Sequence, residues 1–104
     1  MSVMAAPNRS SITARTGRVE RVEGEPKWYL TVDVLDAKPI QGGLFVRAGE
    51  TARVFVVGEM PRLRAGDVFR AEVEYIGGPG GGQLQLLELG DVRPGPDDSQ
   101  SSKD

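Results

Sequence analysis

Apolar side chains recur at every second position through much of this chain, and that spacing most restricts its fold. Between Trp28 and Val34 the even positions are apolar, whereas the odd positions carry more polar or charged side chains. Segments 51–57 and 67–76 repeat the alternation. A period of two is typical of strands with one buried face, and no window of about ten residues shows the helical period of 3.6. The sequence therefore predicts an all-β protein with little or no helix. The side chains predicted to face the core are Trp28, Leu30, Val32, Val34, Ala52, Val54, Val56, Phe69, Ala71, Val73 and Tyr75.

Turn-forming residues divide the middle of the chain into strands. Extended segments are predicted at 11–23, 27–37, 44–48, 51–57, 67–76 and 83–91. A Glu-Gly-Glu-Pro turn at 23–26 joins the first two, and the glycine-rich stretch 77–82 joins the last two. Gly49-Glu50 fits a two-residue hairpin turn between 44–48 and 51–57. The pattern indicates antiparallel neighbours joined by hairpins.

Two of these strands change phase partway along. The apolar parity shifts around Gly17 in the first strand, and between Leu86 and Leu87 in the last. One extra residue in a strand is what a β-bulge inserts, and bulges let strands bend sharply. Bent strands favour closure of a small sheet into a barrel, which removes exposed edges. We therefore predict a five- to six-stranded antiparallel barrel.

This arrangement resembles the OB-fold, a five-stranded Greek-key barrel. The similarity covers about residues 11–91: a long first strand interrupted by glycine, an antiparallel partner, a third strand and a final hairpin. That hairpin opens with Leu63-Arg64-Ala65-Gly66-Asp67-Val68, which is similar to the turn before the fourth strand of many such barrels. OB-folds often place a helix before this strand, but Pro61 leaves room here for at most one helical turn.

Composition narrows the domain organisation and the chemistry. A single barrel domain is predicted at 11–92, with a flexible tail at 1–10 and a disordered tail at 93–104, because neither end carries enough apolar surface to pack. The chain has no cysteine and no histidine, so it lacks thiolate chemistry, the commonest metal ligand and the usual general base. We expect a cytoplasmic protein that is not an enzyme and that binds no metal, cofactor or membrane.

The OB-fold resemblance implies a ligand site on the outer face of the second and third strands. On this sequence the face is formed by Tyr29, Thr31, Arg53 and Phe55, with Arg15 and Arg47 on neighbouring segments. Tyr29 and Phe55 could stack on bases and the arginines could pair with phosphates, which suits single-stranded nucleic acid or another extended ligand. Alternatively, Phe55 packs under a loop. Against nucleic acid, the formal net charge is -2 and Asp33 lies on the same face.

The second hypothesis is a protein-interaction or assembly module that does not bind nucleic acid. It rests on apolar side chains that the alternation does not assign to the core, namely Phe45, Val57 and Ile76. Such side chains would bind a protein partner. The two hypotheses predict different behaviour: salt-dependent oligonucleotide binding for the first, and self-association or a partner protein for the second.

Overall fold

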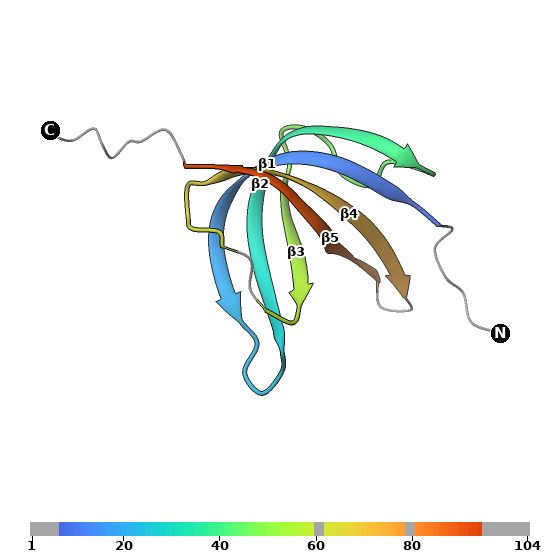
Figure 1. Cartoon of the computed structure of the whole chain (residues 1–104). Coiled ribbons are helices and arrows are strands. Elements are labelled where there is room, and N and C mark those ends of the chain that lie inside the picture. Colours follow the sequence, from blue (N-terminus) through green and yellow to red (C-terminus); the bar gives the residue numbers. More distant parts are fainter. Residues whose placement is uncertain (1–6, 60–61, 79–80, 95–104) are drawn as a thin grey trace, which may run out of the picture.

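The computed structural model describes residues 7–59, 62–78 and 81–94. In these residues the chain forms strands and no helix, which confirms the all-β prediction. The strands are β1 (Arg9–Arg21), β2 (Lys27–Gln41), β3 (Thr51–Val57), β4 (Val68–Gly78) and β5 (Gly81–Arg93) (Figure 1). This part of the chain accordingly contains no helix with the length and hydropathy to cross a membrane.

The sheet closes into a ring in the order β1-β2-β3-β5-β4, and β4 returns to pair with β1. Four of the five pairings are antiparallel, but β3 and β5 run parallel through two register pairs, Val54 with Leu84 and Phe55 with Gln85. The predicted small barrel is therefore confirmed, with one parallel junction in an otherwise antiparallel ring. The reason is geometric: in a ring with an odd number of strands, the direction cannot alternate at every neighbour.

Both predicted bulges are present and bend the long strands that Figure 1 shows curving across the barrel. The β1–β2 register shifts between Thr16 and Arg18, so Gly17 is the extra residue. A Cβ on Gly17 would lie 2.9 Å from the backbone oxygen of Thr31, which explains glycine there. On β5 the register passes over Leu87, at the predicted change of phase. These bends let a small sheet close on itself.

The predicted strand at 44–48 is not formed, and β2 instead continues to Gln41. Segment 43–47 is irregular, and its Val46 side chain enters the core. A turn follows in which the Glu50 amide donates to the Arg47 carbonyl and Gly49 has φ 93°. This turn is held to β2 because the Gly49 amide donates to the Val34 carbonyl. Of the apolar residues that suggested a strand, Val46 thus packs into the core without a partner strand, whereas Leu44 and Phe45 stay exposed.

The turn before β4 has the predicted Gly-Asp chemistry and docks on the β1 bulge. Gly66 has φ 94°, and a carboxylate oxygen of Asp67 accepts a hydrogen bond from the Arg64 amide at 2.9 Å. The Gly66 amide donates to the Thr16 carbonyl, and the Thr16 amide donates to the Asp67 carbonyl. Leu63, just before the turn, is buried in the core. The connection from β3 to β4 thus covers part of the barrel interior without a helix in its described residues.

The core occupies the barrel interior and contains most of the residues predicted from parity. Trp28 packs against this core while partly exposed, and Arg21 lies over its ring. Tyr75, also predicted to face inward, is only partly buried and stacks on Phe45. The buried cluster consists of Ile12, Ala14, Leu30, Val32, Val34, Val46, Val54, Val56, Leu63, Phe69, Ala71, Val73 and Leu86.

The barrel starts earlier than the predicted residue 11. β1 begins at Arg9, and Asn8 is buried with its side-chain amide bonded to both backbone groups of Tyr75 at 2.9 Å. Residues 8–10 therefore belong to the barrel. At the other end β5 reaches Arg93. The rest of the predicted tails, 1–6 and 95–104, lies outside the described residues.

We expect Thr16→Val to stabilise the fold by about 1 kcal/mol. Thr16 is buried, and its hydroxyl has no hydrogen-bond partner among the described residues. A buried hydroxyl without a partner costs about 1–3 kcal/mol, and valine has nearly the same shape. Urea denaturation should show a higher midpoint with an unchanged slope. A lower midpoint would mean that the hydroxyl has a partner.

Candidate ligand-binding face

Two cross-strand rows bring together four of the predicted site residues on the outside of the barrel. In one row Tyr29 lies between Glu20 on β1 and Phe55 on β3. In the next row Thr31 lies between Arg18 and Arg53. Because register partners on one face of a sheet are adjacent, these side chains form one surface. We call it the β2–β3 face and define it by Arg18, Glu20, Lys27, Tyr29, Thr31, Arg53 and Phe55.

The two aromatic rings of this face have different exposures. Tyr29 is half-buried, whereas Phe55 is only 9% exposed. Their ring centroids are 6.4 Å apart with an interplanar angle of 60°, an edge-to-face contact. The side chain of Phe55 is covered by neighbours on the sheet, including Lys27, whose Nζ lies 4.6 Å from its ring centroid. Phe55 therefore supports Tyr29 from beside it, and Tyr29 carries the accessible aromatic surface.

Cations lie over the rings. The Cζ of Arg53 is 3.9 Å from the ring centroid of Tyr29, and Nζ of Lys27 is 5.1 Å from the same centroid. Each such contact contributes about 0.5–1 kcal/mol at an exposed site. Lys27 was not among the predicted site residues. The alternation on β2 could have identified it, because positions 27, 29 and 31 have the same parity and therefore point to one side of the strand. Together these contacts hold two positive groups against one aromatic side chain.

One carboxylate opposes the positive charge of this face. Glu20 lies 3.8 Å from Arg18 and 3.9 Å from Arg53, measured between a carboxylate oxygen and a guanidinium nitrogen. Both separations are near the upper limit for an ion pair, and exposed pairs contribute little to stability. The Arg53 side chain remains 60% exposed. Against Glu20 stand three cations, Arg18, Lys27 and Arg53, so the face is positive within a chain of net charge -2.

The two remaining predicted residues lie away from the rings. Arg15 belongs to the row beyond Thr31, where it faces Asp33, and the Asp33 carboxylate accepts a hydrogen bond from the Thr51 hydroxyl at 3.1 Å. Arg47 lies in the β2–β3 connection, where its amide donates to the Glu50 carboxylate. The structure therefore continues the β2–β3 face toward Arg15 but does not bring Arg47 to the rings.

Comparison of the chain with protein-family models, with curated proteins and with solved structures gave no match. Across the described ranges there is also no group of three or more carboxylates that could hold a metal ion. The chemistry of the β2–β3 face is that of ring stacking, cation–π contact and anion binding. These are the interactions by which single-stranded nucleic acids are bound.

Proposed function

We propose that this protein is a cytoplasmic binding module for single-stranded nucleic acid, with no catalytic activity of its own, and that the β2–β3 face is its site. The observation that carries the proposal is Tyr29, a partly exposed ring with the guanidinium of Arg53 3.9 Å from its centroid. Bases stack on tyrosine rings and on guanidinium planes, so a nucleotide can bind to either member of this pair. Phe55 fixes the position of the ring from beside it.

The charge distribution supports an anionic ligand despite the acidic composition. Phosphate contacts supply most non-specific affinity, and they depend on local rather than total charge. Arg18, Lys27 and Arg53 provide this charge around Tyr29, with Arg15 one row beyond. Because Glu20, and Asp33 opposite Arg15, offset part of it, we expect modest affinity with a clear dependence on salt.

A salt titration with a fluorescently labelled single-stranded oligonucleotide tests the proposal. Three phosphate contacts predict a slope of about −2 for the logarithm of the affinity against the logarithm of the salt concentration. Glu20→Gln should strengthen binding, because it releases Arg18 and Arg53 from their carboxylate. Arg62→Gln, which removes one exposed positive charge from the β3–β4 connection, is the control and should leave affinity unchanged. Absence of binding at low salt would refute the proposal.

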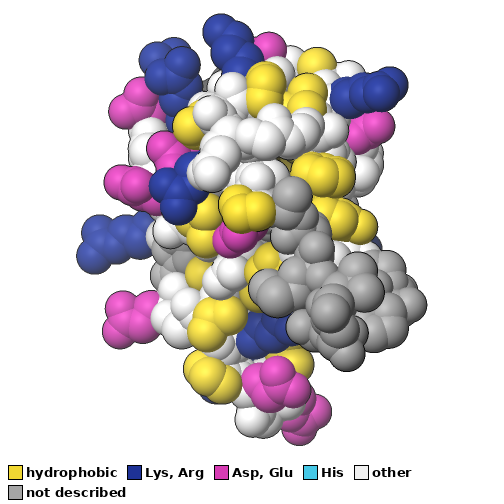
Figure 2. Space-filling view, turned by 90° about the vertical axis from the view of Figure 1, so that its right-hand side faces the viewer, with side chains coloured by type: hydrophobic (Ala, Val, Ile, Leu, Met, Phe, Trp, Pro, Cys, Tyr) yellow, Lys and Arg dark blue, Asp and Glu magenta, His cyan; other side chains and the backbone are white. Residues whose placement is uncertain are grey.

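The alternative, a protein-interaction module, is favoured by exposed apolar side chains. Val57 is 58% and Ile76 41% exposed. Figure 2 views the molecule from the right-hand side of Figure 1. On this face apolar side chains lie along the middle, and most charged groups lie toward the rim. Phe45 is stacked on Tyr75, the neighbour of Ile76 on β4, with centroids 4.5 Å apart, whereas Val57 lies on β3 beside Lys27. A monodisperse monomer at high concentration in light scattering would exclude self-association.

A further inference from the structure

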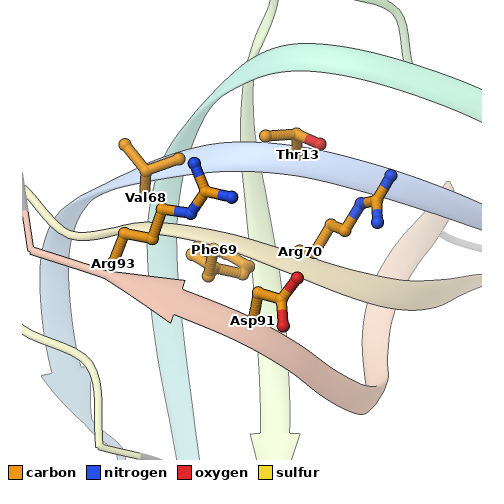
Figure 3. A pocket seen from close by; sticks show the side chains of 6 residues that line it. All are labelled: Thr13, Val68, Phe69, Arg70, Asp91 and Arg93. Carbon is orange, nitrogen blue, oxygen red and sulfur yellow. The ribbon is translucent and has the colours of Figure 1, made fainter.

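A surface pocket of about 290 Å³ lies outside the β2–β3 face, over β1, β4 and β5. Figure 3 shows Arg93 and Arg70 at its two sides, with Thr13 on β1 across from Asp91 on β5. Phe69, whose side chain is buried in the core, also lines the pocket. The size is close to the lower end of the range for small-ligand pockets, about 300–1,000 Å³. The lining residues are Thr13, Val68, Phe69, Arg70, Asp91 and Arg93.

The guanidinium groups of this pocket are not neutralised by ion pairs. Within the part of the chain that the structure describes, the ion pairs join Arg9 to Glu72, and Arg18 and Arg53 to Glu20. Among the described residues, neither Arg70 nor Arg93 forms an ion pair, although Asp91 lines the same pocket. Two exposed guanidinium groups on either side of a hollow are suited to bind an oxyanion, because each presents a fork of N–H donors.

The register connects this pocket to the β2–β3 face. One row crosses the sheet from Arg93 through Val68 to Arg15 and on to Asp33. Arg15 on β1 is therefore two strands away from Arg93 on β5. It also lies in the cross-strand row next to the row of Arg18. Neighbouring strands are about 4.8 Å apart, so the path from β3 through β2, β1 and β4 to Arg93 on β5 is about 19 Å. Exposed or partly exposed arginines lie along this path: Arg53, Arg18, Arg15, Arg93 and Arg70.

We infer that a single strand bound at the β2–β3 face continues across β1 and places its phosphodiester backbone in the pocket between Arg70 and Arg93. This inference rests on the proposed function and extends it, because it gives the strand a direction and a second set of phosphate contacts. The Thr13 hydroxyl adds a neutral donor at the pocket wall. Asp91 opposes a phosphate there and keeps these contacts weak.

The test compares a thymidine dinucleotide, which is too short to reach from Tyr29 to the pocket, with an oligothymidylate of about twelve nucleotides, which is within the site sizes of such barrels. The double variant Arg70→Gln/Arg93→Gln should weaken binding of the longer strand about tenfold. The slope of the logarithm of its affinity against the logarithm of the salt concentration should become less steep by about 1.4. Binding of the shorter strand, confined to the β2–β3 face, should not change. Asp91→Asn should strengthen binding of the longer strand only. Arg62→Gln again serves as a control for the loss of one exposed positive charge away from the pocket.

The outcomes separate the inference from the proposed function. If the longer strand binds the wild-type protein and the double variant equally well, the pocket is not part of the site while the β2–β3 face stands. If neither strand binds the wild-type protein, both proposals fail. If Arg70→Gln/Arg93→Gln weakens both strands equally, the effect is general charge or altered folding, and the inference is overturned. Thermal melts of each variant identify altered folding directly.

Discussion

Tyr29→Ala is expected to lower the affinity for a single-stranded oligonucleotide by about 1–3 kcal/mol, which is roughly 5- to 150-fold. The substitution removes the accessible ring of the β2–β3 face and the surface on which Arg53 rests. Phe55 cannot replace it, because only 9% of that residue is exposed. Fluorescence anisotropy at low salt with a labelled oligonucleotide measures the change.

Two variants show whether the loss belongs to the ring itself. Tyr29→Phe keeps the stacking surface and should bind nearly as well as the wild type. Phe45→Ala removes a ring on another part of the barrel, where it stacks on Tyr75, and should leave affinity unchanged. If Phe45→Ala weakens binding and Tyr29→Ala does not, the ligand lies on the other side of the molecule.

Phe69→Ala should reduce the free energy of unfolding by about 3–5 kcal/mol, the usual effect of deleting a buried phenylalanine ring. Phe69 is 1% exposed and is among the largest fully buried side chains. Small domains are stable by about 5–15 kcal/mol, so this one change removes a large part of the total. Guanidinium denaturation followed by the fluorescence of Trp28, the single tryptophan of the chain, measures the loss.

The matched control is again Phe45→Ala. This ring is 47% exposed, and its stacking contact contributes about 0.5–1.5 kcal/mol. Its removal should therefore shift the denaturation midpoint much less than removal of Phe69. Equal losses from the two variants would contradict the assignment of Phe69 to the core and of Phe45 to the surface.

The parts of the fold that depend on neighbouring residues were predictable from the sequence. Alternation placed Leu30, Val54 and Val73 inside, and changes of phase located the bulges at Gly17 and Leu87. The same reasoning failed at 44–48, because an apolar segment can enter a core without a strand beside it. The alternation also did not predict the parallel β3–β5 junction, because that junction follows from how the whole ring of strands closes.

In the candidate site, too, some features were predictable from the sequence and others were not. Parity alone predicted that Tyr29 and Arg53 share the outer face, and the register makes them diagonal neighbours. Burial of Phe55 was one of the two outcomes that the sequence allowed, but the contact of its ring with Lys27 was not predicted. The pocket between Arg70 and Arg93 was also missed. It forms only when β1 pairs with the β4–β5 hairpin, which is distant from β1 in the sequence, so no local spacing indicates it.

The short parallel junction between β3 and β5 links closure of the barrel to the proposed binding face. Joined by only two register pairs, it is the seam at which the ring opens most readily, because local opening follows the places with fewest supporting contacts. Phe55 is one of the residues in that seam, and it is also the support for Tyr29. Transient separation of β3 from β5 would therefore loosen the contact by which Phe55 supports Tyr29 on the proposed binding face. A bound nucleic-acid strand would in turn stabilise the closed barrel.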